Sequence, residues 1–228
     1  GYAHQLYDTE RGATNSIASS SNAASVVKSS GLTAFNSNGF SLGSHSNHNS
    51  SGQDYISWTF RKKKKFFDIV TYTGNGANRT IAHSLGGPVG FMAVKRLNSL
   101  GAMTTFHRSL GATKFMEMHS THYQQTGSAV WNNTAPTNAV FSLGTDSAVN
   151  ASGSTYVAYL WADNSSEDLE EQMVICNNAT YSGANNIIQL PWQPQFMFVK
   201  SNTNTDDWTV MDTSRGFEAE GSNGVRLK

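Results

Sequence analysis

Hydrophobic and aromatic residues in this sequence come in short runs, and polar segments rich in Gly, Asn, Pro or Ser separate the runs. β-Branched and aromatic residues dominate the runs, which is typical of strands. Turn signals such as Asn36-Ser37-Asn38-Gly39 and Thr73-Gly74-Asn75-Gly76 lie between them. The predicted strands are residues 55–60, 67–72, 90–95, 155–161, 172–176 and 195–200.

Many short strands separated by turns favour an all-β fold of jelly-roll or β-sandwich type over a parallel α/β sheet. Little helix is expected. Residues 12–30 are small and rich in Ser and Ala, with weak helical spacing. We interpret them as a loop with at most one short helix.

The chain resembles itself at a spacing of about 100 residues. Phe40-Ser41-Leu42-Gly43 recurs 101 residues later, and so does the aromatic run at 55–60. The motif Phe-Met-x-Val-Lys at 91–95 recurs 105 residues later. Landmarks that recur in a common register indicate repeated structural units.

A further landmark occurs three times and ends each time in Gly. It is Tyr-Asp-Thr-Glu-Arg-Gly at 7–12, Phe-His-Arg-Ser-Leu-Gly at 106–111 and Met-Asp-Thr-Ser-Arg-Gly at 211–216. The spacings are 99 and 105 residues. The predicted unit is therefore about 100 residues long.

This register divides the chain into parts. Residues 1–65 correspond to the back half of a unit, 66–165 to a complete unit and 172–228 to the front half of another. The acidic stretch 166–171 is either the linker between units or a short helical turn with Ser166 as its N-cap. Because unpaired strand edges are sticky, the two halves are expected to close into one β-sandwich, within the chain or with a neighbouring subunit.

Composition narrows the range of functions. The chain has 16 basic and 16 acidic residues, so its net charge is zero, and only 14% of its residues are charged. A neutral chain has no overall field that would draw it to nucleic acid or an anionic membrane, and neither is expected as a partner. No apolar run is long enough to span a bilayer. The single cysteine, Cys176, excludes an internal disulfide framework, and the start at Gly1 leaves a fragment, a processed product and a partial chain as alternatives.

No set of residues predicts catalysis or a cofactor. Two His-x-x-His pairs, His45/His48 and His119/His122, could bind a transition metal, but neither lies beside a carboxylate cluster. We interpret them as loop histidines and expect no metal site.

Two further sets of residues are candidates for catalysis, and neither has the arrangement that catalysis needs. His83 and Ser84 are adjacent on a predicted strand and point to opposite faces, so they cannot act as base and nucleophile to each other. The acidic pair Asp206-Asp207 precedes Trp208 in a polar loop, which favours a structural role over sugar hydrolysis. We therefore expect that the protein is not an enzyme.

The only basic cluster of the sequence is the run Arg61, Lys62, Lys63, Lys64 and Lys65. Five consecutive cations could bind phosphates or anionic glycans. The run lies where one unit ends and the next begins. A solvated linker is the first interpretation, and an assembly contact with an acidic neighbour, such as the stretch 167–171, is the second.

Three tryptophans lie among Asn, Thr and Pro residues: Trp131, Trp192 and Trp208. An aromatic ring flanked by polar side chains can stack on a sugar ring, so these residues are candidates for binding a glycan. The alternative is that each ring folds back onto the core.

Several runs resemble a repeated β-rich domain of virion proteins in tailed bacteriophages, especially marine ones. They are Trp58-Thr59-Phe60-Arg61-Lys62, Phe66-Phe67-Asp68-Ile69-Val70-Thr71-Tyr72-Thr73-Gly74-Asn75-Gly76, Gly39-Phe40-Ser41-Leu42-Gly43 and Asn150-Ala151-Ser152-Gly153-Ser154-Thr155-Tyr156. The resemblance extends over roughly residues 5–215. The lysine run at 62–65 departs from the mixed small and Pro stretch that is commoner there.

The resemblance implies a virion structural protein and no catalytic residues. We expect a tail fibre, spike or capsid-attached appendage that is assembled in the host cytoplasm and displayed on the virion surface. Its expected partners are other virion proteins, further copies of itself (a trimer by the habit of fibres) and a glycan on the host surface. The alternatives are a tail-borne carbohydrate-active enzyme and a head decoration protein without a ligand.

Overall fold

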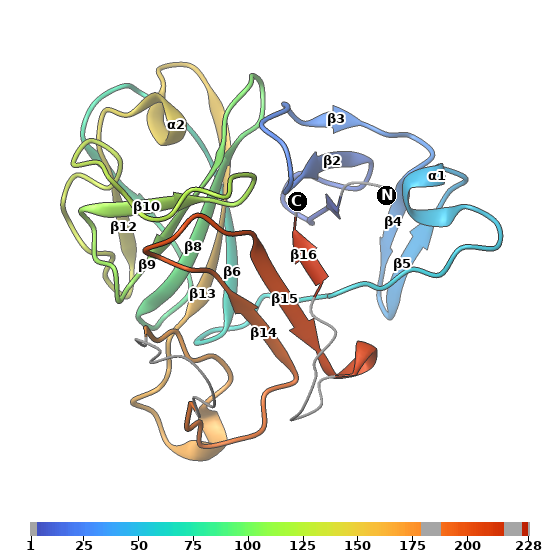
Figure 1. The fold of residues 1–228 in the computed structure, drawn as a ribbon. Coiled ribbons are helices and arrows are strands. Elements are labelled where there is room, and N and C mark those ends of the chain that lie inside the picture. Colours follow the sequence, from blue (N-terminus) through green and yellow to red (C-terminus); the bar gives the residue numbers. More distant parts are fainter. Residues whose placement is uncertain (1–3, 179–187, 217–224, 228) are drawn as a thin grey trace.

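The computed structural model describes residues 4–178, 188–216 and 225–227, whose strands form five sheets (Figure 1). The largest sheet has six strands in the order β11-β10-β9-β8-β13-β6, and every neighbouring pair is antiparallel. Its strands are β6 (Phe67–Thr73), β8 (Val89–Arg96), β9 (Met103–His107), β10 (Lys114–Glu117), β11 (Gln125–Thr126) and β13 (Thr155–Ala162). We call residues 66–165, which contain this sheet, the middle unit.

Strand β13 is buried on both faces of the large sheet. It pairs with β6 on one side and with β8 on the other along nearly its whole length. Because side chains alternate between the faces of a strand, Tyr156, Ala158 and Leu160 enter one hydrophobic cluster while Val157 and Tyr159 enter another. The middle unit therefore needs covering elements on both sides of its sheet.

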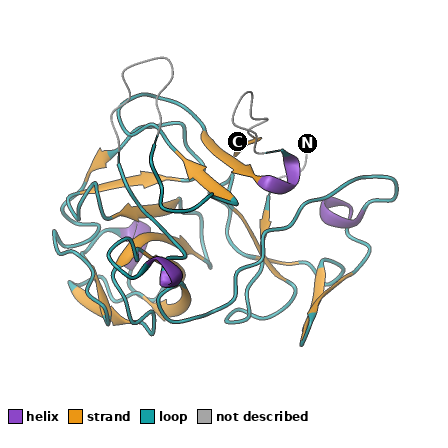
Figure 2. Cartoon of the chain, turned by 90° about the horizontal axis from the view of Figure 1, so that it is seen from below, coloured by secondary structure: helices purple, strands orange, loops and turns teal. Residues whose placement is uncertain are grey.

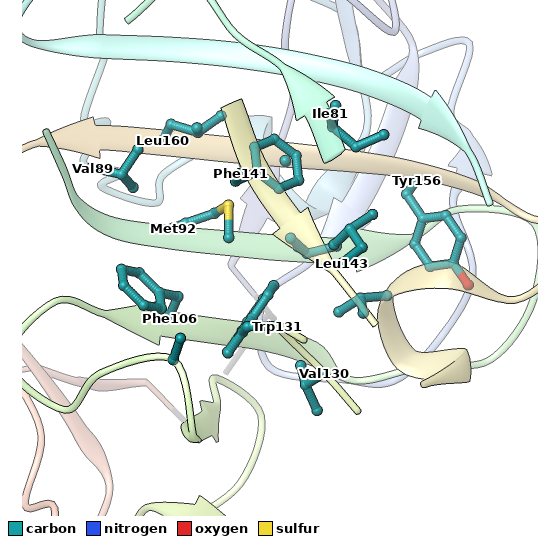
Figure 3. Packing of buried hydrophobic residues seen from close by; sticks show 14 of the residues in the cluster. Ile81, Val89, Met92, Phe106, Val130, Trp131, Phe141, Leu143, Tyr156 and Leu160 are labelled. Carbon is teal, nitrogen blue, oxygen red and sulfur yellow. The ribbon is translucent and has the colours of Figure 1, made fainter. Parts of the chain in front are cut away.

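A two-stranded sheet of β7 (Arg79–Ala82) and β12 (Val140–Leu143) covers the first face. Phe141 and Leu143 on β12 are fully buried against the strands of the large sheet (Figure 3). The four-residue helix α2 (Ser147–Asn150) follows β12 and adds Val149 to the same cluster.

The first part of the chain covers the second face. We call residues 4–65 the N-terminal segment. Ile17 is buried in the same cluster as Ala93 and Met103 of the large sheet. The strands of this segment are β1 (Gln5–Leu6), β2 (Asn15–Ala18) and β3 (Val26–Val27) in one sheet and β4 (Leu32–Asn36) and β5 (Gly39–Leu42) in a second, followed by helix α1 (Ser46–Asn49).

The last described part of the chain, which we call the C-terminal segment (residues 188–216 and 225–227), forms a separate sheet. Its strands are β14 (Phe196–Val199), β15 (Trp208–Asp212) and β16 (Val225–Leu227), in that order. Trp208 and Val210 on β15 are buried together with Met116 of the middle unit. The remaining helical pieces are two 3-10 turns, η1 (Leu169–Glu171) and η2 (Thr213–Arg215).

The protein is mostly β, as the sequence predicts, and its helices are short (Figure 2). Four of the six predicted strands are present. Residues 55–60 and 172–176 are not assigned to strands, because the described residues offer them no neighbouring strand with which to form a ladder. The expected loop at 12–30 contains β2 and β3 instead of a helix.

The expected joining of 1–65 with 172–228 is not a strand pairing within this chain. Among the described residues the strands of the two parts lie in different sheets. The two parts meet through side chains instead, with the rings of Trp58 and Phe196 5.9 Å apart. The acidic stretch forms the turn η1, whose N-cap is Asp168 rather than Ser166.

The first cluster should control global stability. Phe141→Ala removes a fully buried ring between two sheets and should lower the free energy of unfolding by about 3–5 kcal/mol. Leu100→Ala, at a side chain that is 67% exposed, is the matched control and should change it by less than about 0.5 kcal/mol. Urea denaturation followed by tryptophan fluorescence measures both, and similar values for the two variants would contradict this assignment of the core.

Candidate functional site

A buried ion pair joins the N-terminal segment to the middle unit. Asp8 follows β1 and is only 4% exposed. Its carboxylate accepts a hydrogen bond of 2.5 Å from Arg11 Nε and one of 2.6 Å from the hydroxyl of Tyr159 on β13. Arg11 Nη2 in turn donates to the Tyr159 hydroxyl at 3.2 Å. Both side chains of the pair are therefore hydrogen-bonded to the hydroxyl of a tyrosine from the middle unit.

The local sequence explains how Asp8 and Arg11 come together. The backbone N–H of Arg11 donates to Asp8 Oδ1 at 2.8 Å, so the carboxylate closes a turn that spans residues 8–11. Gly12 follows with φ +82°, a conformation that favours glycine. Arg11 also donates to the carbonyl oxygen of Asn15, which fixes the guanidinium in place.

A second ion pair of the same design joins the C-terminal segment to the N-terminal segment. Asp212, at the end of β15, accepts hydrogen bonds from the backbone N–H and from Nε of Arg215. It also accepts one of 3.2 Å from the indole N–H of Trp58. The Arg215 guanidinium lies 5.0 Å from the centroid of the Trp58 ring, within range of a cation–π contact. Gly216 again has a positive φ, +91°.

We call these two arrangements the clamps: Asp8/Arg11 around Tyr159, and Asp212/Arg215 around Trp58. Each is a carboxylate and a guanidinium three residues apart that hold the polar tip of an aromatic side chain from another part of the chain. The held residues are themselves 101 positions apart, in the register of the sequence repeat.

Electrostatics in the second clamp favour the charged carboxylate. At Asp212 burial acts to raise the pKa, but the hydrogen bonds and charge of Arg215, together with the Trp58 indole, bring the pKa below its ordinary value. Burial, with a smaller contribution from the Asp8 carboxylate, raises the pKa of the Tyr159 hydroxyl far above its ordinary value. The tyrosine therefore stays protonated and acts as a hydrogen-bond donor.

The sequence analysis missed these residues, although the signal was present. Asp and Arg occupy the same positions in the first and third copies of the glycine landmark, whereas the middle copy has His107 and Leu110. Gly111 of the middle copy keeps the positive φ, +78°. The turn is thus common to all three copies, and the ion pair is present only in the two that grip an aromatic tip.

The basic run makes contacts within the chain. Lys62 pairs with Glu10 at 2.8 Å and with the buried Asp68 at 3.2 Å. Lys65 pairs with Glu167 at 3.0 Å and Glu171 at 3.3 Å, so it meets the acidic stretch suggested as its partner, but in the same chain. Arg61, Lys63 and Lys64 are exposed.

The candidate glycan-binding tryptophans are mostly covered. Trp131 is 1% exposed and its indole N–H donates to the carbonyl oxygen of Lys114 at 3.1 Å. Trp208 is 3% exposed and donates to the carbonyl oxygen of Glu117. Trp192 is half-buried. Neither Trp131 nor Trp208 has a free face for a sugar, because both rings fold back onto the core.

His83 and Ser84 line a shallow hollow of about 270 Å³ beside Lys62 and Asp68. His83 Nδ1 accepts from the backbone N–H of Leu85, and its Nε2 lies 3.2 Å from a backbone carbonyl oxygen. Both ring nitrogens therefore contact the backbone. Asp68 accepts from the backbone N–H of Ser84 at 2.7 Å and not from its hydroxyl. The side chains that line this hollow therefore form an ion pair and bind backbone groups, which is typical of a structural role.

The histidine pair His45/His48 lies at helix α1, apart from the hollow beside His83. His45 caps helix α1 through Nδ1, and its ring stacks on that of His48 at 5.3 Å. In the part of the chain that the structure describes, no three His, Cys, Asp or Glu side chains gather around a possible metal position. No described helix is long and apolar enough to cross a membrane.

The first clamp should contribute measurably to stability. Tyr159→Phe removes the hydroxyl that donates to the Asp8 carboxylate and should lower the free energy of unfolding by about 1–3 kcal/mol, as for other hydrogen bonds to charged groups. Tyr123→Phe, at a ring that is 47% exposed, is the matched control and should be neutral. If urea denaturation gives the same midpoint for both variants, the clamp does not stabilise the fold.

The second clamp should respond to acid. Because the pKa of Asp212 is below its ordinary value in the folded protein, its contribution is present above the unfolded-state pKa of about 4 and is lost as the pH falls through the folded value. Asp212→Asn lacks this contribution at every pH. The difference in unfolding free energy between wild type and variant should be largest near pH 6 and should shrink toward pH 2.5. A constant difference in urea denaturation across this range would refute the assignment.

Comparison with known proteins identifies the chain by family and not by activity. No curated protein sequence and no solved structure matches it. Residues 1–226 match the family described as "Domain of unknown function (DUF7483)". The match extends over nearly the whole chain, and the protein therefore belongs to the DUF7483 family.

Proposed function

We propose that this protein is a structural component of a bacteriophage virion surface, built from β units of about 100 residues, and that it acts through assembly contacts and not through catalysis. The observation that carries the proposal is a hydrogen-bonded turn that occurs twice, 101 residues apart, in parts of the chain with different surroundings.

Both turns are organised by a tyrosine hydroxyl. In the N-terminal segment the hydroxyl of Tyr55 donates to the carbonyl oxygen of Ser46 at 2.9 Å and accepts from the backbone N–H of Ser50 at 3.0 Å. In the middle unit Tyr156 makes the same two hydrogen bonds with Ser147 and Ala151, each of 2.8 Å.

The elements around the turns also correspond. Helices α1 and α2 begin 101 residues apart, and each is capped by the side chain of the residue before it. Gly43 and Gly144 each lie against a backbone carbonyl group, of Ser30 and Ala129, so closely that a Cβ at either glycine would clash. These shared constraints explain why the short motifs recur, and they support a repeated unit.

The connections between the parts of the chain support assembly as the function. The clamps and the ion pairs of Lys62 with Glu10 and of Lys65 with Glu167 connect residues that are distant in sequence. The sequence resemblance to repeated domains of phage virion proteins supports the proposed location on the virion surface.

Glycan adhesion is not part of the proposal. Two of its three candidate tryptophans are buried with their indole N–H groups bonded to backbone oxygens. The proposed partners are other virion proteins and further copies of this protein. The position of the protein on intact particles distinguishes a tail protein from a head protein.

Electron microscopy of intact particles tests the proposal. Gold-labelled antibodies raised against the purified chain should decorate gradient-purified virions at a fixed position, and cryo-electron microscopy should show density with a regular copy number there. An antibody against a cytoplasmic host enzyme is the matched control. The proposal is wrong if the chain stays in the soluble fraction of the lysate and is absent from purified particles.

A further inference from the structure

Two hairpins in this structure contact the segment before them in the same way. The first connects β8 to β9 in the middle unit, and the second connects β14 to β15 in the C-terminal segment. Each starts at the lysine that ends a Phe-Met-x-Val-Lys motif. The loop that receives each hairpin follows β2 in the first case and β10 in the second.

In the first contact the middle unit binds the N-terminal segment. Lys95 is fully buried, and its Nζ donates to the carbonyl oxygens of Gly101 at 2.6 Å and Ser21 at 3.1 Å. The backbone N–H of Gly101 donates to the carbonyl oxygen of Asn22 at 2.8 Å. Farther along, the N–H of Ser25 donates to the carbonyl oxygen of Leu97, also at 2.8 Å.

In the second contact the C-terminal segment binds the middle unit. Lys200 Nζ donates to the carbonyl oxygens of Asp206 at 2.7 Å and Thr121 at 2.9 Å. The backbone N–H of Asp206 donates to the carbonyl oxygen of Thr121 at 2.9 Å. The N–H of Gln124 donates to the carbonyl oxygen of Asn202 at 3.3 Å.

Three of the four hydrogen bonds correspond group by group, and the fourth, from the lysine Nζ to the loop, is shifted by one residue: Lys95 binds Ser21, whereas Lys200 binds Thr121, the counterpart of Asn22. On the hairpin side Lys95, Gly101 and Leu97 are each 105 residues before Lys200, Asp206 and Asn202. On the loop side Asn22 and Ser25 are each 99 residues before Thr121 and Gln124. These are the same two spacings at which the glycine landmark recurs. The lysine is the only side chain that makes a hydrogen bond in both contacts. All the other donors and acceptors are backbone groups.

The apolar part of the contact corresponds as well. Ile17 of the N-terminal segment lies in one cluster with Met103 of the middle unit. Met116, 99 residues after Ile17, lies in one cluster with Trp208, 105 residues after Met103. Ile17 on β2 and Met116 on β10 thus each place a buried apolar side chain onto the sheet of the segment that follows.

We infer that the chain contains one head-to-tail interface between units, used twice, and that its natural partner is another unit of the same kind. The interface is heterologous: one unit contributes the loop and the buried apolar residue, and the next contributes the lysine hairpin and the sheet face. A heterologous interface whose rotation closes produces a ring.

The clamps indicate that this ring closes after three units. In the first clamp Asp8 and Arg11 of the N-terminal segment grip Tyr159 of the next unit. In the second clamp Asp212 of the C-terminal segment grips Trp58, which belongs to the N-terminal segment. In both clamps one segment contributes the ion pair and the next segment contributes the aromatic residue. The C-terminal segment therefore has the same relation to the N-terminal segment as the N-terminal segment has to the middle unit.

The three parts accordingly surround a pseudo-threefold axis within one chain. Phe60 and Trp161, 101 residues apart, meet there edge to face at 5.8 Å. One copy of the chain supplies the arrangement that three separate one-unit subunits would otherwise form. This inference concerns how units bind each other, so it holds or fails independently of a virion location.

Disulfide trapping tests the interface. In a Cys176→Ala background, Ser25→Cys with Leu97→Cys and Gln124→Cys with Asn202→Cys place cysteines at corresponding positions, each pair joined by one backbone hydrogen bond. A disulfide forms only where the two Cα atoms lie within about 7 Å of each other. Both pairs should oxidise within one chain. The mismatched pair Ser25→Cys with Asn202→Cys is the control and should stay reduced, since it joins a loop to the wrong hairpin. A disulfide in the mismatched pair, or in only one matched pair, overturns the inference.

Hydrogen exchange provides a second test that needs no new cysteine. Lys95→Met should accelerate amide exchange at Ser25 and Gly101, and Lys200→Met should accelerate it at Gln124 and Asp206, each by about tenfold or more. Lys64→Met is the control, because Lys64 is exposed and lies outside both contacts, so the substitution should leave all four amides unchanged. The inference is contradicted if either lysine variant accelerates exchange at the amides assigned to the other contact. It is also contradicted if the control accelerates exchange as much as the two lysine variants do.

Discussion

Strand β13 is the element on which the rest of the structure depends. It is paired on both edges, by β6 and β8, and its alternating side chains form parts of two hydrophobic clusters on opposite faces of the sheet. A strand buried on both faces needs two covering layers. One comes from β7 and β12 within the middle unit, and the other comes from the N-terminal segment, which is why that segment is bound so closely. Tyr159 on the same strand then extends beyond the apolar cluster to a carboxylate, so one strand provides both the packing and the polar connection between the two parts.

The sparse charges of the chain are concentrated where its parts meet. Burying an isolated charge is costly, but a carboxylate that receives a guanidinium and a hydroxyl is satisfied, and such a pair tolerates few alternative partners. Asp8, Asp212 and Lys95 each lie at the meeting of two segments, and each has its partners in place. Burial lowers the pKa of Lys95 to about 8, which shows how strongly the site disfavours the bare charge that the two carbonyl oxygens must solvate. An apolar contact can slide, whereas these groups fix the register of one segment on the next.

The sequence predicted the parts of the fold that follow from local pattern. The strands at 67–73, 89–96, 155–162 and 196–199 are runs of apolar residues whose partners are nearby in the chain or in the same unit. It failed where the outcome depends on a distant partner. The aromatic run at 55–60 has the composition of a strand but no described neighbouring strand, and Trp131 and Trp208 have polar neighbours in sequence but apolar neighbours in space. The clamps were missed because Asp and Arg three residues apart are common, and only the aromatic ring from another segment gives the pair a function.

The three copies of the glycine landmark share some features and differ in others. All three copies keep a glycine with positive φ, because the turn itself requires it. The Asp and Arg before that glycine are present in the first and third copies, where the facing residue is Tyr159 or Trp58. A phenol hydroxyl and an indole N–H differ in shape but both donate one hydrogen bond to a carboxylate, so the aromatic residue can change while the contact persists. In the middle copy His107 and Leu110 replace the pair, and the neighbouring Arg108 binds Asp163 of its own unit instead. The landmark therefore forms a turn in all three copies, and it connects two segments in the two copies whose Asp and Arg contact Tyr159 or Trp58.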